Sequence, residues 1–225
     1  MKQKSKKIKS RRYRRLTELV KVSLVVILIG LVVRLFVLFP YRVDNTDMED
    51  ALYPGDFLLA SQLSYKFGEP KVGDVVVFEH PFKVDEHSVG RVLAIEGQTV
   101  EIIGKTVYVD DEKIIDIGNV KYTDPDIIPE IYSKRDYADP VTVPSGSVFI
   151  LDDNRDQAED SRNFGLVHID DLIGKGLFVY WSWKPDPDSP AWESPYIIPA
   201  ISILFYNLLH FPSRIGWDRL GSGTN

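Results

Sequence analysis

The chain has no cysteine among its 225 residues, no internal repeat and, between Pro40 and Trp183, no ten-residue stretch with clean helical periodicity. The missing cysteines exclude disulfide bonds, thiolate metal sites and a cysteine nucleophile, and they suit a domain outside the cytoplasm. The missing helical pattern excludes a helical bundle as the main domain. With 44% hydrophobic and 27% charged residues, the chain has the composition of a globular protein, with room for one medium domain and a membrane element.

Positive charge is scarce outside the N-terminus. Residues 1–39 hold 11 Lys and Arg against the single Glu18, which leaves 16 Lys and Arg against 32 Asp and Glu in the remainder. Nucleic acid is therefore excluded as the partner of the main domain, since phosphate binding needs a basic face. The overall net charge of -6 hides two regions of opposite charge.

An apolar run of 18 residues, 22–39, is interrupted only by Arg34 and has about the length that a bilayer core requires. It predicts a transmembrane helix that follows a basic cytoplasmic tail, residues 1–21. Nine Lys and Arg in residues 2–15 place the N-terminus in the cytoplasm and the following domain outside, at the cell membrane. A cleavable signal peptide is the alternative, but the run is long for one and no small-x-small site follows it.

A second apolar stretch, residues 196–211 within the C-terminal segment 196–225, follows a Pro-rich linker, residues 184–195. Sixteen helical residues rise about 24 Å, slightly short for a span. Tryptophans flank the stretch, as they flank helices that lie in the membrane interface. The sequence leaves both readings open, with a buried core helix as a third.

Residues 40–183 alternate short β-rich runs with turn residues, a pattern that predicts an all-β domain of antiparallel sheets. Gly104 and Lys105, between TVEII and TVYV, have the character of a two-residue hairpin turn. Residues 116–140 are rich in Asp, Tyr and Pro and predict a surface excursion. The runs expected to form strands are DFLLAS, DVVVFEH, GRVLAIE, TVEIIG, TVYVDD, VTVP, SVFILD and LFVYWSW.

Five ordered segments resemble the boxes of type I signal peptidases, membrane serine peptidases that remove signal peptides with a Ser-Lys dyad. The segments are RLFVLFPYRV (34–43), DNTDMEDALYPGDFLL (44–59), VGDVVVFEHP (72–81), SVGRVLAIEGQTVEI (88–102) and VPSGSVFILDDNRDQAEDSRNFGLV (143–167). They cover most of residues 32–183 in the family's order and spacing. The resemblance implies the family's antiparallel β fold behind the N-terminal transmembrane helix.

Ser-Lys chemistry needs a hydroxyl nucleophile and a desolvated amine as its base. By the resemblance, the nucleophile precedes Met48, where this chain has Asp47, and the base precedes Arg91-Val92, where it has Gly90. The serine that orients the lysine is replaced by Ala158. No catalytic residue of the family is therefore intact, and useful Ser-Lys turnover is expected to be lost.

Other residues of the boxes have expected roles as well. Asn45 replaces the hydroxyl that assists the oxyanion and still offers an amide donor. The residues expected to line the substrate groove are Val43, Asn45, Met48 and Leu52. Alternating charges in the last box predict an ion-pair network that holds a loop. Its residues are Asp153, Asn154, Arg155, Asp160 and Arg162.

The unpaired charge of Asp47 in a partly apolar cleft is costly, so we expect Arg91 or Arg162 to supply a cation, or the cleft to be open to water. Shared-proton chemistry among Asp47, Asp153 and Asp160 is a further reading, with a structural role favoured. We expect no metal and no cofactor. The acidic loop lacks the glycine and terminal glutamate of a calcium-binding EF-hand, and His80 and His87 read as solvated loop histidines.

These observations predict a membrane-anchored homologue that acts by binding rather than cutting. Its expected partners are the lipid bilayer and either signal peptides or membrane-proximal segments, or an active paralogue that it regulates. Two alternatives stay open. One is a functional signal peptidase with a non-standard site, and the other is a purely structural surface protein.

Overall fold

The computed structural model describes residues 2–114, 117–189 and 197–224. The chain separates into two compact units, Met1–Leu38 and Phe39–Asn225. The first consists of helix α1 (Lys2–Phe36), and its stretch Thr17–Phe36 is long and apolar enough to cross a membrane. Among the described residues it is the one helix that meets this condition.

The boundary of this helix differs from the prediction. The expected transmembrane helix ran to residue 39, but α1 ends at Phe36 and strand β1 (Leu38–Arg42) begins two residues later. Pro40 explains the change, because proline disfavours helical backbone at the residue before it. The basic residues expected to form a separate tail belong to α1 as well, because this helix begins at Lys2.

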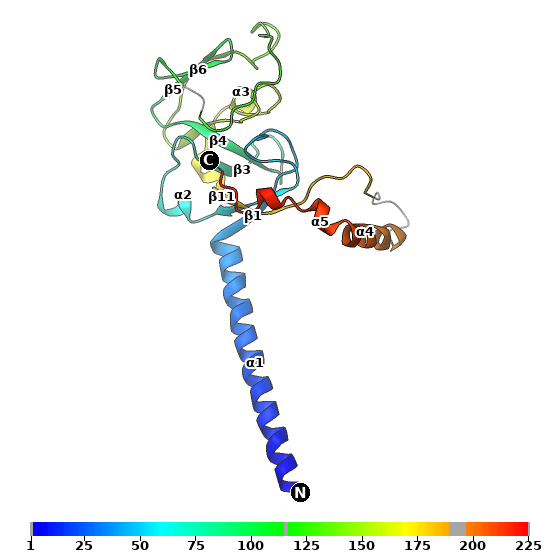
Figure 1. The fold of residues 1–225 in the computed structure, drawn as a ribbon. Helices are drawn as coiled ribbons and strands as arrows, with labels where there is room; N and C mark the ends of the chain where they lie inside the picture. Colours follow the sequence, from blue (N-terminus) through cyan, green and yellow to red (C-terminus); the bar gives the residue numbers. More distant parts are fainter. Residues whose placement is uncertain (1, 115–116, 190–196, 225) are drawn as a thin grey trace. The chain divides into compact units, whose positions relative to one another are not determined.

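The second unit is built on two antiparallel sheets (Figure 1). The larger has seven strands in the order β1-β2-β11-β3-β4-β9-β10, and the smaller has four in the order β7-β6-β5-β8. The strand bounds are β2 Asp56–Ser61, β3 Val75–Glu79, β4 His87–Ile95, β5 Thr99–Ile103, β6 Thr106–Val109, β7 Glu112–Lys113, β8 Ala138–Thr142, β9 Ser147–Leu151, β10 Val167–His168 and β11 Leu172–Ser182. The antiparallel all-β fold class is confirmed.

One helix of 13 residues, α4, and several short helical turns complete the unit. They are α2 Ser64–Phe67, α3 Ser161–Phe164, η1 Ile169–Asp171, α4 Ile197–Leu209, α5 Phe211–Arg214 and η2 Trp217–Arg219. The predicted hairpin is confirmed: Ile103 pairs with Thr106, and Gly104 and Lys105 both have positive φ, 56° and 69°. That is the backbone of the two-residue turn that matches strand twist.

Strand β3 is buried on both faces of the large sheet. Val75 and Val77 pack in one apolar cluster with Leu58 and Val179, while Val76 and Phe78 pack in another. This explains the uninterrupted apolar run VVVF, because alternate side chains of a strand point to opposite faces. A third cluster joins β4, β5, β6 and β9. The sheet that carries the site is therefore held from both sides.

The predicted excursion at residues 116–140 has its first residue outside the described ranges, and it ends in β8. Arg135 fixes much of it through ion pairs to Asp124 and Asp136, each at 2.8 Å. Of the predicted linker, residues 190–195 also lie outside the described part. Lys184 is not free chain, because its N–H donates to the carbonyl of Arg214 at 2.8 Å.

Candidate functional site

The site begins at the turn after β1, which carries Asp47. Asn45 donates from Nδ2 to Asp47 Oδ2 at 2.6 Å, so the amide expected to assist an oxyanion is bound to the neighbouring carboxylate. Asn154 holds this turn against the last box: its backbone N–H donates to the Asp47 carbonyl at 2.9 Å, and its Nδ2 donates to the Thr46 carbonyl at 3.0 Å. The fold therefore brings the predicted nucleophile position and the last box together.

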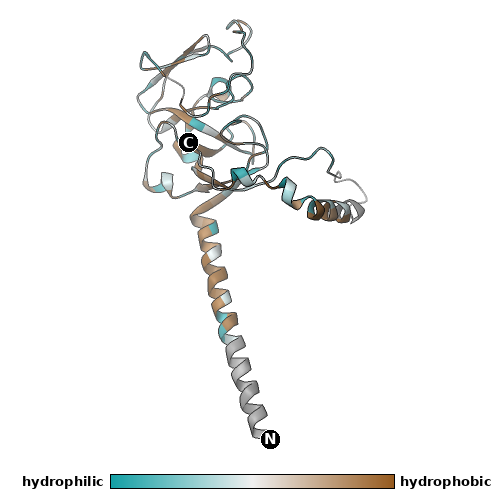
Figure 2. Cartoon of the chain, viewed as in Figure 1, coloured by the Kyte–Doolittle hydropathy of each residue, from teal (hydrophilic) through white to brown (hydrophobic). Residues whose placement is uncertain are grey.

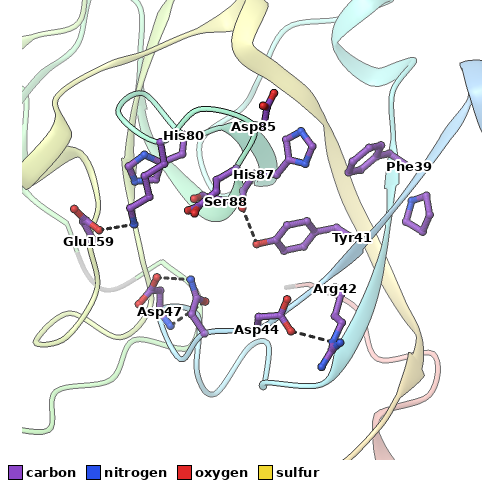
Figure 3. Close-up of a pocket in the computed structure, with 14 residues that line it drawn as sticks. Phe39, Tyr41, Arg42, Asp44, Asp47, His80, Asp85, His87, Ser88 and Glu159 are labelled. Carbon is purple, nitrogen blue, oxygen red and sulfur yellow. Dashed lines mark hydrogen bonds and ion pairs between the residues drawn. The ribbon is translucent and has the colours of Figure 1, made fainter. Parts of the chain in front are cut away.

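Asp47 opens onto a cavity of about 590 Å³ (Figure 3). Two ion pairs lie in its wall, Lys83 to Glu159 and Arg42 to Asp44, both at 2.9 Å. Other wall residues are Phe39, Pro40, Tyr41, Asn45, His80, Asp85, Glu86, His87 and Ser88. The wall is richer in carboxylates than in cations, so the cavity is acidic.

Burial raises the pKa of Asp47 from 3.8 to about 6, and the charges of Asp160 and Glu159 act in the same direction. Lys83 opposes the shift. The expectation that Arg91 or Arg162 supplies the cation is wrong, because each of these arginines pairs with another aspartate. The open cleft, the other half of that expectation, is what the cavity provides.

Gly90, at the position of the family's base, lies inside β4 opposite Val76 of β3. A Cβ atom at Gly90 would overlap Oδ1 of Asp152 and would lie 2.5 Å from Cγ2 of Ile150. Real Cβ atoms do not make contacts this close, so any side chain here requires its neighbours to move. The space next to Gly90 is filled by a carboxyl group.

Asp152 is the residue beside Gly90 that sequence reasoning missed. It is 3% exposed, and its Oδ1 has no hydrogen-bond partner among the described residues. Burial, together with the charges of Asp160 and Asp47, raises its pKa well above the usual range of a carboxyl group. The available signal was the doubled aspartate in LDDNRD, of which only the second matches the family's box.

The last box forms ion pairs, but not all of those expected. Asp153 receives two hydrogen bonds from Arg91, from Nε and Nη2, each at 2.8 Å. Asp160 receives bonds from Arg162 at 2.8 and 2.7 Å and also caps α3 through the Arg162 N–H. Arg155 departs from the prediction, because its Nε and Nη1 are buried without hydrogen-bond partners in the described structure. Its carbonyl instead accepts from Arg162 at 2.7 Å.

Three of the four predicted groove residues lie elsewhere. Val43, Met48 and Leu52 are 0% exposed and belong to the core cluster beneath the turn, whereas Asn45 does line the cavity. The three are apolar because they anchor the turn that presents Asp47. Ala158 lies in the turn between β9 and α3, where its N–H donates to the Asn154 carbonyl at 3.0 Å.

His80 and Ser88 also reach the cavity wall. His80 is 7% exposed, which corrects its reading as a solvated histidine. Its Nδ1 accepts from the Phe82 N–H at 3.2 Å, and burial lowers its pKa, so the ring stays neutral at pH 7. Ser88 sits on β4, paired with Phe78. Among the described residues, no group of three or more His, Cys, Asp or Glu is placed to hold a metal ion.

The comparisons with known proteins agree on one family. Its model, described as "Signal peptidase, peptidase S26", matches residues 16–181. The chain is 33% identical over 157 residues to signal peptidase IB of Staphylococcus aureus, which covers 66% of this chain and 81% of that protein. Identity to the probable thylakoidal processing peptidase 2 of Arabidopsis thaliana is 32% over 168 residues, 72% of this chain and 43% of that protein.

A signal peptidase I of Aquifex aeolicus is 27% identical over 242 residues, covering 85% of this chain and 94% of its own. A crystal structure of a signal peptidase I from Enterococcus faecalis aligns with 48% of this chain and 96% of its own, at a TM-score of 0.37 and 24% identity. The family match extends over more than half of the sequence. The chain therefore belongs to the signal peptidase family, peptidase S26.

Proposed function

We propose that this chain is a membrane-anchored signal peptidase homologue that binds signal peptides, or other extended segments close to the membrane, without cutting them by Ser-Lys chemistry. One observation carries the proposal. Gly90 has no side chain at the position expected for the base, and the Asp152 carboxyl fills the space beside it. Asp47 adds to this, because a carboxylate has no proton to give up as the attacking hydroxyl does.

The cavity supplies the binding part of the proposal. Strand β1 is the outermost strand of the large sheet, and four of its residues, 39–42, contribute to the cavity wall. An edge strand presents unpaired backbone groups to which an extended peptide can add as a further strand. Pro40 removes one donor from this edge, so pairing would rely on the remaining residues.

The test measures binding and cleavage in one sample. A fluorescent signal peptide is titrated with the full chain in nanodiscs, followed by anisotropy and by the appearance of cleaved product. Ser88→Trp fills the cavity and is expected to weaken binding several-fold, whereas the matched control Ser145→Trp changes an exposed serine away from the cavity and leaves it intact. Equal binding by both variants would contradict the proposal. Binding only to an active paralogue would favour the regulatory version.

A second candidate, peptide hydrolysis by a carboxyl pair, is favoured by one observation. Burial raises the pKa of both Asp47 and Asp152, and the charge of Asp47 adds to the shift at Asp152, so the two carboxyl groups interact. Such a pair can activate water and protonate a carbonyl. Cleavage that is lost in both Asp47→Asn and Asp152→Asn, and that peaks below neutral pH, would establish this candidate. No cleavage at any pH would remove it.

A further inference from the structure

The segment that contains α4 leaves the domain and returns to it at one place. Trp183 and Ile215 form an antiparallel bridge, and the Lys184 N–H donates to the Arg214 carbonyl at 2.8 Å. Residues 185–213 are therefore a loop closed at its base. A helix inside it cannot cross a bilayer once, because that would put residues 214–224 on the opposite side from the sheet they contact.

The return is fixed by the tail that follows. The backbone carbonyl of Ser222 accepts from the Val179 N–H at 3.0 Å, and the Gly221 N–H donates to the Val179 carbonyl at 2.8 Å. The tail therefore pairs with β11 along its backbone. Arg219 pairs with the buried Asp56 at 2.7 Å. The spanning reading of the second apolar stretch is thus incompatible with the observed tail. The 13 residues of α4 also rise only about 20 Å.

Helix α4 has two distinct faces. On one, Tyr206 donates from its hydroxyl to Asp186 at 2.9 Å, and Asn207 accepts from Arg214. The other face is an apolar stripe at the i, i+3, i+4 spacing of one helix face, 51–76% exposed. The stripe consists of Ile201, Leu204, Phe205, Leu208 and Leu209. In Figure 2 much of the coloured part of α4 is brown, that is, apolar.

A bilayer is the surface that this stripe fits. Only two residues, 37 and 38, separate the candidate span Thr17–Phe36 from the start of the domain at Phe39, so this short tether keeps the domain within reach of the membrane that the span enters. Phe211 and Trp217, 44% and 60% exposed, follow α4 by two and eight residues, and such aromatic rings favour the headgroup region.

We propose that α4 lies flat in the interface of the bilayer that anchors α1, with its apolar stripe among the upper acyl chains. The inference rests on the proposed membrane anchorage. The helix would give the domain a second attachment to the membrane, next to the bridge between Trp183 and Ile215. The buried-core reading of this stretch is excluded by the exposure of the stripe.

The absence of cysteine makes a direct test available. The full chain carries one cysteine at a time, Leu204→Cys, Leu208→Cys or the control Ile131→Cys, which replaces a side chain 84% exposed in the domain. Each is labelled with an environment-sensitive fluorophore and reconstituted into liposomes that contain lipids spin-labelled at shallow or deep positions. We expect blue-shifted emission and several-fold stronger shallow than deep quenching at residues 204 and 208, and water-like emission at residue 131.

Three results would overturn the inference. Water-like emission on α4 would show that the stripe stays in solvent. Deep quenching as strong as shallow quenching would indicate a span, and a blue shift without lipid quenching would indicate contact with protein, including a second copy. Leu28→Cys separates this inference from the anchorage: if that label is not quenched at depth, the anchorage fails as well. None of these measurements depends on peptide binding.

Discussion

Asp152 and Asp153 are neighbours in the chain and both are buried, yet their surroundings are opposite. Asp153 receives two short hydrogen bonds from Arg91, whose positive charge compensates that of the carboxylate. Asp152 has an oxygen with no hydrogen-bond partner in the described structure and lies where a side chain on Gly90 would be. Its pKa is raised, so it holds its proton more tightly than an ordinary carboxyl group. Asp153 is part of a buried ion pair, whereas Asp152 crowds Gly90, the position that the resemblance assigns to the base.

The difference separates what the fold needs from what the reaction needs. The Arg91–Asp153 and Arg162–Asp160 pairs tie the long strand β4 and the short helix α3 to the loop between β9 and α3, and both are retained. By the resemblance, the positions of nucleophile, base and orienting hydroxyl hold Asp47, Gly90 and Ala158, of which Asp47 lines the cavity. A buried ion pair is costly to break one partner at a time, whereas catalytic groups can be lost without unfolding the domain.

The largest loss of stability is expected from breaking the buried ion pair between Arg91 and Asp153. Arg91→Met leaves Asp153 buried without its cation and is expected to lower the free energy of unfolding by about 3–5 kcal/mol. Urea unfolding of the purified chain in detergent, followed by tryptophan fluorescence, measures the change. A loss below about 1 kcal/mol would show that the pair contributes no more than an exposed one.

The next effect concerns the crowding of Gly90 by Asp152. Gly90→Ala is expected to destabilise by about 1–3 kcal/mol, as overpacking does in a filled core. In an Asp152→Gly background the cost should shrink but not vanish, because Ile150 still lies 2.5 Å from the added atom. A double-mutant cycle by urea unfolding gives the coupling, and zero coupling would contradict the overlap.

The raised pKa of Asp47 should make the stability of the fold depend on pH. The folded pKa of Asp47, about 6, lies above its ordinary 3.8, so protonation stabilises the folded state. This contribution is complete below about pH 4 and is lost as pH rises through 6, to the extent of about 1–3 kcal/mol. Stability of the unmodified chain should fall relative to Asp47→Asn across that interval. Parallel curves from pH 4 to 7 would count against the raised pKa.

The smallest effect is expected at the cavity rim. Lys83 and Glu159 form an ion pair at 2.9 Å, but their side chains are 45% and 54% exposed. Lys83→Met should change the free energy of unfolding by less than about 1 kcal/mol, because solvent screens such pairs. The same urea measurement serves as the exposed counterpart of Arg91→Met. A loss of stability as large as that of Arg91→Met would show that the exposed and the buried ion pairs do not differ in the way described.

Much of the fold was predictable because its signals are local. The strands and the Gly104-Lys105 hairpin follow from β-rich runs and turn residues that need no knowledge of distant contacts. The end of α1 was misjudged, since apolar residues continue past Phe36 into β1, and hydrophobicity alone does not distinguish the two. The position of the tail on β11 depends on contacts between residues far apart in sequence and could not be predicted.

The family's boxes mark three positions of the site, Asp47, Gly90 and Ala158, and the roles given to them stay predictions. Two features required three-dimensional register. Asp152 reaches Gly90 because β9 and β4 pair with Arg91 opposite Leu151. Met48 and Leu52 were placed in the groove because their box surrounds the nucleophile, but a turn has two sides and theirs faces the core.

The most direct measurement is cleavage of a signal-peptide substrate by the full chain in nanodiscs, run beside Asp47→Ala. We expect no product from either, because Asp47 and Gly90 stand at the positions where the resemblance places the hydroxyl and the amine of a Ser-Lys pair. A reconstruction with Asp47→Ser, Gly90→Lys, Ala158→Ser and Asp152→Gly tests whether the lost groups suffice. Product from the unmodified chain that persists in Asp47→Ala would contradict the account, because it would require a nucleophile elsewhere.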